Sequence, residues 1–162
     1  MDKELELQSM KIPEGGFWLP KGVGPTVDVV DAIRDAGIKE QPADCEPLII
    51  TKPIQVAHGE ATLAALPGPK DTLEIIYEFE AAPPIGRQTL SFRLGDDDFV
   101  EQLAPARTFV FEHEAQALRD RGLGKHLSPK ELLVISPTGP IDNQFRYADE
   151  CVRHKVLDLI GD

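Results

Sequence analysis

The sequence predicts an α+β fold, in which helices cover one face of an antiparallel or mixed sheet of short strands. Between residues 48 and 94 the chain carries several segments that are apolar or alternate between apolar and polar residues, the pattern of strands. Residues 97–103 and 149–160 instead fit helices. The 13 glycines and 14 prolines supply frequent turns. Together these observations predict a two-layer domain of sheet and helices.

Length and charge set broad limits on function. The 162 residues suffice for one domain with a core, or for one domain and part of another. A net charge of −11 disfavours nucleic acid and anionic membrane surfaces as partners, and it also serves plain solubility. The start of the sequence is not a signal peptide, and no apolar run approaches membrane-spanning length. The only cysteines, Cys45 and Cys151, form no paired framework, so we expect a cytoplasmic protein.

The first part of the chain is expected to form a unit of its own. Residues 4–8 alternate like a short strand, and residues 11–25 read as an irregular loop. A helix should follow from about Val27 to Ala36, capped by Thr26 and ended by Gly37. The polar linker at residues 39–47 then separates two expected domains, 1–41 and 42–162.

The second domain is expected to begin with a hairpin. Residues 48–57 form one broken strand, residues 58–60 turn the chain, and residues 61–66 return it. His58 and Glu60 could be a metal ligand and a base, but a solvated turn is the simpler interpretation at a hairpin tip. Two more strands, at residues 73–80 and 88–94, should follow.

The three aspartates at residues 96–98 have two interpretations. They invite a calcium site, but the spaced ligand loop and its closing Glu are absent. They fit better in the first turn of a short helix that runs to Leu103. Beyond it, a helix at residues 112–121 and a strand at 132–135 predict a strand–helix–strand insert over about residues 109–136, attached as an appendage.

The segment 149–162 carries the clearest chemical signal. At helical spacing one stripe is apolar, formed by Val152, Val156, Leu159 and Ile160, and the opposite face holds Cys151, His154, Asp158 and Asp162. His154 and Asp158 lie four residues apart, so their side chains meet one turn apart and could share a cation. Imidazole and carboxylate are both good zinc ligands. The alternative is a solvated polar face with a weak His–Asp pair.

This segment, Asp-Glu-Cys-Val-Arg-His-Lys-Val-Leu-Asp-Leu-Ile-Gly-Asp, resembles the signature of the UDP-3-O-acyl-N-acetylglucosamine deacetylases, zinc hydrolases of lipid A biosynthesis. Ala106-Arg107-Thr108-Phe109 resembles a second signature of that family. Residues 24–38 look, more weakly, like the end of the family's first domain. The resemblance implies that residues 42–162 have the fold of the family's second domain and that residues 1–41 are a remnant of the first.

The resemblance also implies roles for individual residues. It makes His154 and Asp158 zinc ligands, Lys155 and Phe109 substrate-binding residues, Thr108 an oxyanion donor, and Asp162 the group that orients a catalytic imidazole. By itself Thr108 could equally be an ordinary strand residue. The implied reaction is metal-assisted hydrolysis of the N-acetyl group of a UDP-linked acylated amino sugar. The insert would form a passage for the acyl chain.

The chain departs from the family pattern in several places. In the family, a Glu-His pair of the first domain supplies the general base and a third zinc ligand, and the general-acid His follows the C-terminal motif. None of these is found here, and His126-Leu127 stand where the family has glycines, narrowing the approach to the metal. We therefore expect weak zinc binding and an exposed helix face that favours self-association. The chain could be an incomplete deacetylase, a non-catalytic binding or structural relative, or a half-site completed by a partner chain.

Overall fold

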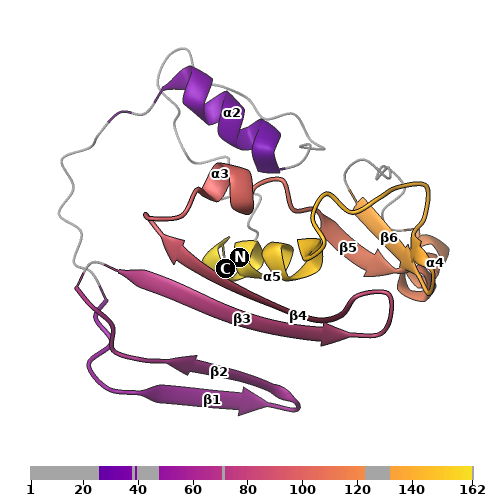
Figure 1. Cartoon of the computed structure of the whole chain (residues 1–162). Helices are drawn as coiled ribbons and strands as arrows, with labels where there is room; N and C mark the ends of the chain where they lie inside the picture. The colour runs from indigo at the N-terminus through magenta and orange to yellow at the C-terminus, as the bar shows by residue number, and fades with distance from the viewer. Residues whose placement is uncertain (1–25, 38, 40–47, 71, 123–131, 162) are drawn as a thin grey trace.

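The computed structural model describes residues 26–37, 39, 48–70, 72–122 and 132–161 (Figure 1). The predictions for the strand at 4–8, the loop at 11–25, most of the linker, and for Cys45, His126, Leu127 and Asp162 lie outside these residues. The described elements, in chain order, are α2 (Thr26–Ala36), β1 (Ile54–His58), β2 (Ala61–Ala65), β3 (Leu73–Ala81), β4 (Gly86–Leu94), α3 (Phe99–Gln102), β5 (Thr108–Phe111), α4 (Glu112–Asp120), β6 (Leu132–Ser136), β7 (Gly139–Pro140) and α5 (Glu150–Gly161). The α+β class is confirmed.

Helix α2 includes Thr26, which was predicted to be its cap, and it ends at the predicted residue and for the predicted reason. Gly37 has a φ of 81°, in the left-handed region that glycine adopts without steric cost. Its N–H donates back to the carbonyl of Ile33 at 3.0 Å, which closes the last turn.

The strands of residues 48–94 form two separate ladders rather than one sheet. Among the described strands, β1 pairs only with β2, and β3 only with β4, both antiparallel. The connection from β2 to β3 contains Pro67 and Pro69, which have no N–H to donate to a sheet. In the same connection the Thr72 hydroxyl donates a hydrogen bond to the carbonyl of Pro69 at 2.8 Å, which closes a turn. The strand expected at residues 48–51 is also wrong, because β1 begins only after Pro53.

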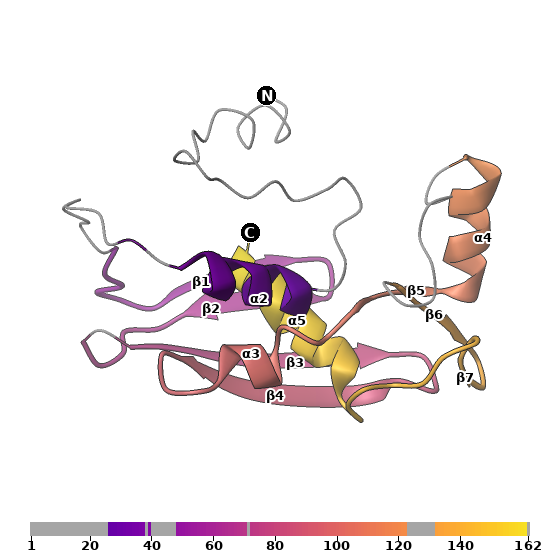
Figure 2. The same cartoon turned by 90° about the horizontal axis from the view of Figure 1, so that it is seen from above.

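Helix α5 lies across one face of the β3–β4 ladder, as expected (Figures 1 and 2). Ile75 and Phe92 face each other across the two strands and point toward the helix. They form a buried cluster with Leu103, just after α3, and Val156 of α5. This cluster fixes the position of α5 relative to the sheet because each of its members is almost completely removed from water.

The insert consists of β5, α4 and β6, with β5 and β6 parallel and α4 as the crossover. Helix α4 stands at one end of the molecule (Figure 2), but the strands are more than an appendage. Leu133 and Ile135 of β6 share a second buried cluster with Ile85 and with Cys151 of α5. The insert therefore packs against the same helix that carries the candidate metal ligands.

This packing corrects the predicted faces of α5. Cys151 and His154 were placed on the face opposite the apolar stripe, yet both are buried, and Leu159, predicted within the stripe, is exposed. The helix touches β3–β4 on one side and β5 on another. A helix covered from two directions buries a wider arc than a single stripe.

The acidic run at residues 96–98 has the structural role that was favoured. The Asp98 carboxylate accepts from the N–H groups of Val100 and Glu101 at 2.9 and 3.0 Å, and so caps α3. Asp97 accepts from the backbone N–H of Arg93 at 2.6 Å. The carboxylates of Asp97 and Asp98 therefore serve to stabilise a turn and to cap a helix.

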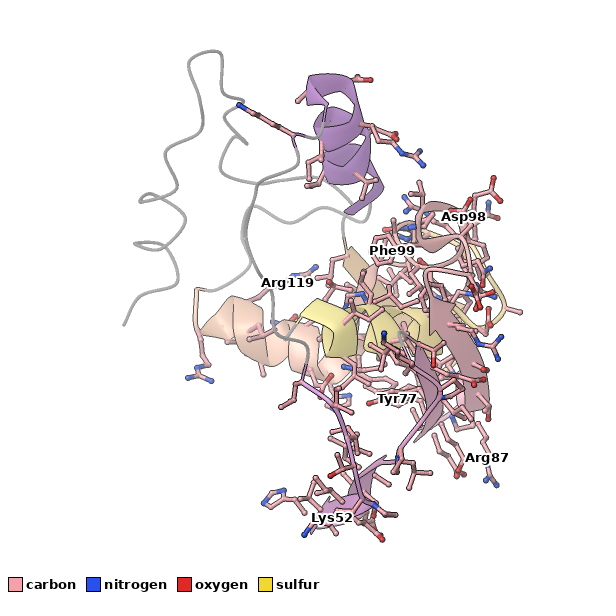
Figure 3. The ribbon with its side chains drawn as sticks, turned by 90° about the vertical axis from the view of Figure 1, so that its left-hand side faces the viewer. Lys52, Tyr77, Arg87, Asp98, Phe99 and Arg119 are labelled. Atoms are coloured by element: carbon pink, nitrogen blue, oxygen red, sulfur yellow. The ribbon has the colours of Figure 1, made fainter. Side chains whose placement is uncertain are left out.

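The exposed apolar side chains gather on strands rather than on a helix face. The β1–β2 hairpin exposes Ile54, Val56 and Leu63, each by at least half. Lys52, which precedes β1, marks this hairpin in Figure 3, apart from the side chains packed around α5. In the described part of the chain, no helix is long and apolar enough to cross a membrane.

Candidate functional site

A buried ion pair joins the two sequence motifs. The guanidinium of Arg107, which precedes β5, donates through Nε to Oε1 of Glu150 at 2.9 Å and through Nη2 to Oε2 at 3.1 Å. The Glu150 side chain is completely buried and that of Arg107 nearly so. Two parallel bonds of this kind fix both position and orientation. The segment 106–109 is therefore anchored against the first turn of α5.

The remaining hydrogen-bonding capacity of this pair is also used. Glu150 accepts two backbone N–H groups, from Arg107 at 3.1 Å and from Arg146 at 2.7 Å. Arg107 donates to Oδ1 of Asn143 at 2.9 Å and to the carbonyl of Gln144 at 2.8 Å. A buried ion pair offsets its desolvation cost only when such additional bonds are present. The loop before α5 is thereby held by the same two side chains.

Two further side chains fasten α5 to its neighbours. The amide of Gln88, on β4, accepts from Val152 N at 3.1 Å and donates to the Ala148 carbonyl at 3.2 Å. Arg153 donates to Asp149 at 2.7 Å and to the carbonyl of Gln102 at 3.0 Å. The orientation of α5 is therefore set by polar contacts with β4, with α3 and with the segment before β5, as well as by its apolar core.

His154 and Asp158 meet on α5 as their spacing predicted. Nε2 of His154 lies 3.3 Å from Oδ1 of Asp158, and Nζ of Lys155 lies 3.5 Å from Oδ2. The His154 side chain is only 11% exposed, whereas that of Asp158 is 42% exposed. The solvated-face interpretation is therefore wrong for His154, and the pair sits at the boundary between the packed interior and solvent.

The environment of His154 favours a neutral ring. Burial lowers the pKa of His154, and the nearby Asp158 carboxylate acts in the opposite direction. Nδ1 is buried and makes no hydrogen bond, although the backbone of Ala106 lies near enough to raise the pKa. A neutral imidazole keeps one lone pair, which is the form that binds a metal ion.

Phe109 and Lys155 lie beside this pair. The Phe109 ring centroid is 6.2 Å from that of His154, in an edge-on arrangement, and Lys155 Nζ is 5.4 Å from the Phe109 centroid. Thr108, the residue before Phe109, is exposed at the start of β5. The structure thus brings four of the six predicted site residues together and places Thr108 next in sequence. Asp162 lies outside the described residues.

The donor set suits a zinc ion as a partial site. An imidazole nitrogen and a carboxylate oxygen, 3.3 Å apart and partly solvated, can approach one cation from the same side. Over the residues described, no group of three or more His, Cys, Asp or Glu side chains could hold a metal ion. His154 and Asp158 are therefore a pair of candidate ligands.

Comparison with known proteins agrees with the motif. A family model described as LpxC, UDP-3-O-acyl N-acetylglycosamine deacetylase, matches residues 11–162. This chain belongs to that deacetylase family. Among the relatives named UDP-3-O-acyl-N-acetylglucosamine deacetylase, the protein of Leptospira biflexa is 36% identical over 140 residues, 86% of this chain and 46% of its own length.

Two other members of the deacetylase family match over similar spans. The Thermodesulfovibrio yellowstonii protein is 36% identical over 146 residues, which are 89% of this chain and 49% of the relative. The Wolinella succinogenes protein is 35% identical over 157 residues, 96% of this chain and 52% of the relative. The chain therefore spans about half the length of the curated deacetylases it matches.

Sequence reasoning missed the deacetylase residues that hold the site together. Arg107 and Glu150 stand inside the two recognised motifs, but no role was assigned to them. Their burial was the missing information. Arg107 is the only charged residue of the segment 106–109 and gave a signal, whereas Glu150 stands among several other charged residues and gave none. Gln88 gave no signal at all, because a glutamine in an alternating strand is common on a solvated face.

Proposed function

We propose that this chain carries part of the metal centre of a zinc-dependent deacetylase, which removes the N-acetyl group of UDP-3-O-acyl-N-acetylglucosamine in lipid A biosynthesis. One observation carries the proposal. His154 and Asp158 lie side by side on α5, next to a motif segment that Arg107 and Glu150 hold against the same helix. A solvated helix pair would need neither the burial of His154 nor this anchor.

Each side chain near the pair has a distinct role in the proposal. His154 and Asp158 bind zinc, which when bound supplies Lewis acidity and an activated water. The Thr108 hydroxyl donates a hydrogen bond to the oxyanion that forms on the acetamide. Lys155 and Phe109, in contact with each other, bind the substrate. Asp162 orients the imidazole that protonates the leaving amine.

The domain arrangement follows from the same proposal. Residues 42–162 correspond to the second domain of the deacetylase fold, with the insert as a passage for the acyl chain, and residues 1–41 belong to the first. The protein acts in the cytoplasm. The general base, the third ligand and the general acid come from parts of the fold that the two motifs do not supply.

Zinc titration tests the metal site directly. With two ligands we expect a dissociation constant weaker than micromolar, further weakened by His154→Ala and by Asp158→Asn. Asp149→Asn is the matched control, because Asp149, the residue before α5, is also a carboxylate paired with a side chain four residues away, that of Arg153. Isothermal calorimetry measures all four proteins. Binding that is insensitive to both ligand substitutions would refute the site.

Activity is tested in a fusion that supplies a family member's first domain and the segment that follows the C-terminal motif. We expect acetate release from the UDP-linked substrate, and Thr108→Val should lower kcat by roughly 100-fold, the usual effect of losing one oxyanion donor. If only the His126→Gly/Leu127→Gly double variant of the fusion is active, the chain is a diverged relative. An inactive, folded and zinc-loaded fusion in both forms would favour a non-catalytic binding or structural domain.

A further inference from the structure

A polar side chain stands on the covered face of the β3–β4 ladder. Gln88 lies directly opposite Phe79, and it shares its face of β4 with Leu90 and Phe92, which pack beneath α5. Gln88 is half-buried, and burying an amide is costly unless its hydrogen-bonding groups are used. An apolar side chain would fill this position without that cost, so packing alone does not explain the amide.

Helix α5 uses both ends of this amide. Oε1 of Gln88 accepts from the Val152 N–H at 3.1 Å, and Nε2 donates to the Ala148 carbonyl at 3.2 Å. A helix that began one residue earlier would join these two backbone groups to each other, because helical N–H groups donate four residues back. Helix α5 instead begins with the bond from Arg153 to Asp149, at 3.2 Å. The amide therefore takes the place of one helical hydrogen bond and ties the first turn of α5 to β4.

The residue opposite Gln88 supports the other half of the candidate site. The ring of Phe79 lies 5.6 Å from that of Phe109, centroid to centroid. Phe109 in turn makes the edge-on contact with His154, at 6.2 Å. His154 follows Val152 by two residues on α5. One cross-strand pair of the ladder therefore supports both partners of this ring contact.

The Arg107–Glu150 ion pair does not by itself set the ring contact. It joins segment 106–109 to the first turn of α5, and two segments joined at one place can still change the angle between them. Apolar packing limits this change, but it is not directional, whereas hydrogen bonds are. The two hydrogen bonds of Gln88 give α5 a directional attachment to the sheet.

We propose that Gln88 is a positioning residue, which sets the angle of α5 on the sheet so that His154 meets the ring of Phe109. This inference rests on the proposed function for its purpose, because the ring contact brings a substrate-binding side chain to the metal ligands. His154 and Asp158 both lie on α5 and move together when the helix moves. Gln88 therefore governs the position of the metal ligands relative to Phe109, and not the geometry of the ligand pair itself.

The ring C–H signals of His154 in the metal-free protein test this proposal by nuclear magnetic resonance. A neighbouring aromatic ring shifts such signals, and Phe109→Leu measures by how much. His154→Ala identifies the signals among those of four histidines. Gln88→Met has nearly the same shape as glutamine but loses both hydrogen bonds, so the His154 signals should move in the same direction as in Phe109→Leu. Spectra recorded well above the ordinary imidazole pKa keep the ring neutral.

Two further variants make the test specific. Gln88→Glu, ionised at this pH, still accepts from Val152 but cannot donate to Ala148, so it should move the His154 signals less. Thr89→Ala is the matched control, because Thr89 is exposed on the other face of β4, and it should leave them in place. Unmoved signals in folded Gln88→Met would overturn the proposal. If that variant does not fold, unmoved signals in Gln88→Glu would do so.

Zinc titration separates the role of Gln88 from the proposed function. Gln88→Met should bind zinc with unchanged affinity, because both candidate ligands remain together on α5. A loss of zinc affinity in this variant, once folded, would contradict a movement of α5 as one body and overturn the proposal. If His154→Ala leaves zinc binding unchanged, the proposed function fails, and the spectra of the metal-free protein still decide the role of Gln88.

Discussion

At the scale of single residues, burial decides which reactive groups of the α5 motif are available for chemistry. Cys151 and His154 are three residues apart and both buried, but they behave differently. The Cys151 thiol packs in a buried apolar cluster with Ile85, Leu133 and Ile135. The ring of His154 reaches the Asp158 carboxylate at the protein surface. Only the histidine is therefore presented to a ligand.

We predict that Cys151 is unreactive in the folded protein. Burial, assisted by the nearby Glu150 carboxylate, raises the pKa of this thiol to about 12, so almost no thiolate forms near neutrality. Mass spectrometry should show slow alkylation by iodoacetamide in buffer and fast alkylation in urea; a Cys45→Ala background leaves Cys151 as the only thiol. Equal rates in the two solvents would contradict the buried position.

The same shift predicts how stability depends on pH. Above the ordinary thiol pKa of 9.0 the unfolded chain loses this proton, whereas the folded protein retains it up to about 12. The unfolded state is then favoured, so the free energy of unfolding should fall as pH rises through this window. Urea denaturation at a series of pH values measures the slope, and Cys151→Ala should reduce it.

At the scale of elements, the local pattern predicted most of the secondary structure. Helices α2 and α5 and strands β3, β4, β5 and β6 form where apolar spacing, caps and turn residues indicated. The buried faces of α5 were predicted less well. Periodicity identifies one apolar stripe, but the second covered side of α5 depends on an insert whose packing the local sequence does not encode.

Adjacent isoleucines on β3 provide a matched test of the layer arrangement. Ile75 faces α5 and is 8% exposed, whereas Ile76 faces away and is 73% exposed. We expect Ile75→Ala to lower the free energy of unfolding by about 2–5 kcal/mol, the range for truncating a buried isoleucine. Ile76→Ala should change it by no more than about 0.5 kcal/mol. Urea unfolding measures both, and similar losses would mean that α5 does not cover this face.

The candidate site shows the same division between local and distant information. His154 and Asp158 were found because helix spacing alone brings their side chains together. The Arg107–Glu150 pair spans 43 positions, and the contact between Gln88 and Val152 spans 64. No local periodicity reports such pairs. Recognition of the motifs located the segments, and only the three-dimensional structure revealed what joins them.

At the scale of the whole molecule, the protein combines a packed centre with an uncovered hairpin. The cores around Phe92 and Leu133 both include residues of α5. The β1–β2 hairpin makes no ladder with β3, and its apolar side chains face solvent. An isolated two-stranded hairpin is only marginally stable in water. The hairpin is therefore the part of the described chain with most to gain from another surface.

We predict that this hairpin promotes self-association. Val56 and Leu63 are directly opposite each other across the strands and are 57% and 54% exposed, so they share one apolar face. Val56→Glu should shift sedimentation velocity profiles toward the monomer. Gln55→Glu adds the same charge to the next residue, on the other face of the strand, and should have little effect. Equal behaviour of the two variants would exclude this face as the contact.

The long reach of the Arg107–Glu150 pair also has a consequence for the order in which the protein folds. The β1–β2 and β3–β4 hairpins close over short loops and can form early, because short loops lose little entropy on closing. The contacts that unite segment 106–109 with α5 join positions 43 residues apart, so they close a longer loop and lose more entropy on closing. The segments around the proposed zinc ligands should therefore meet late, and under the proposed function zinc would be captured by an almost finished protein rather than directing its folding.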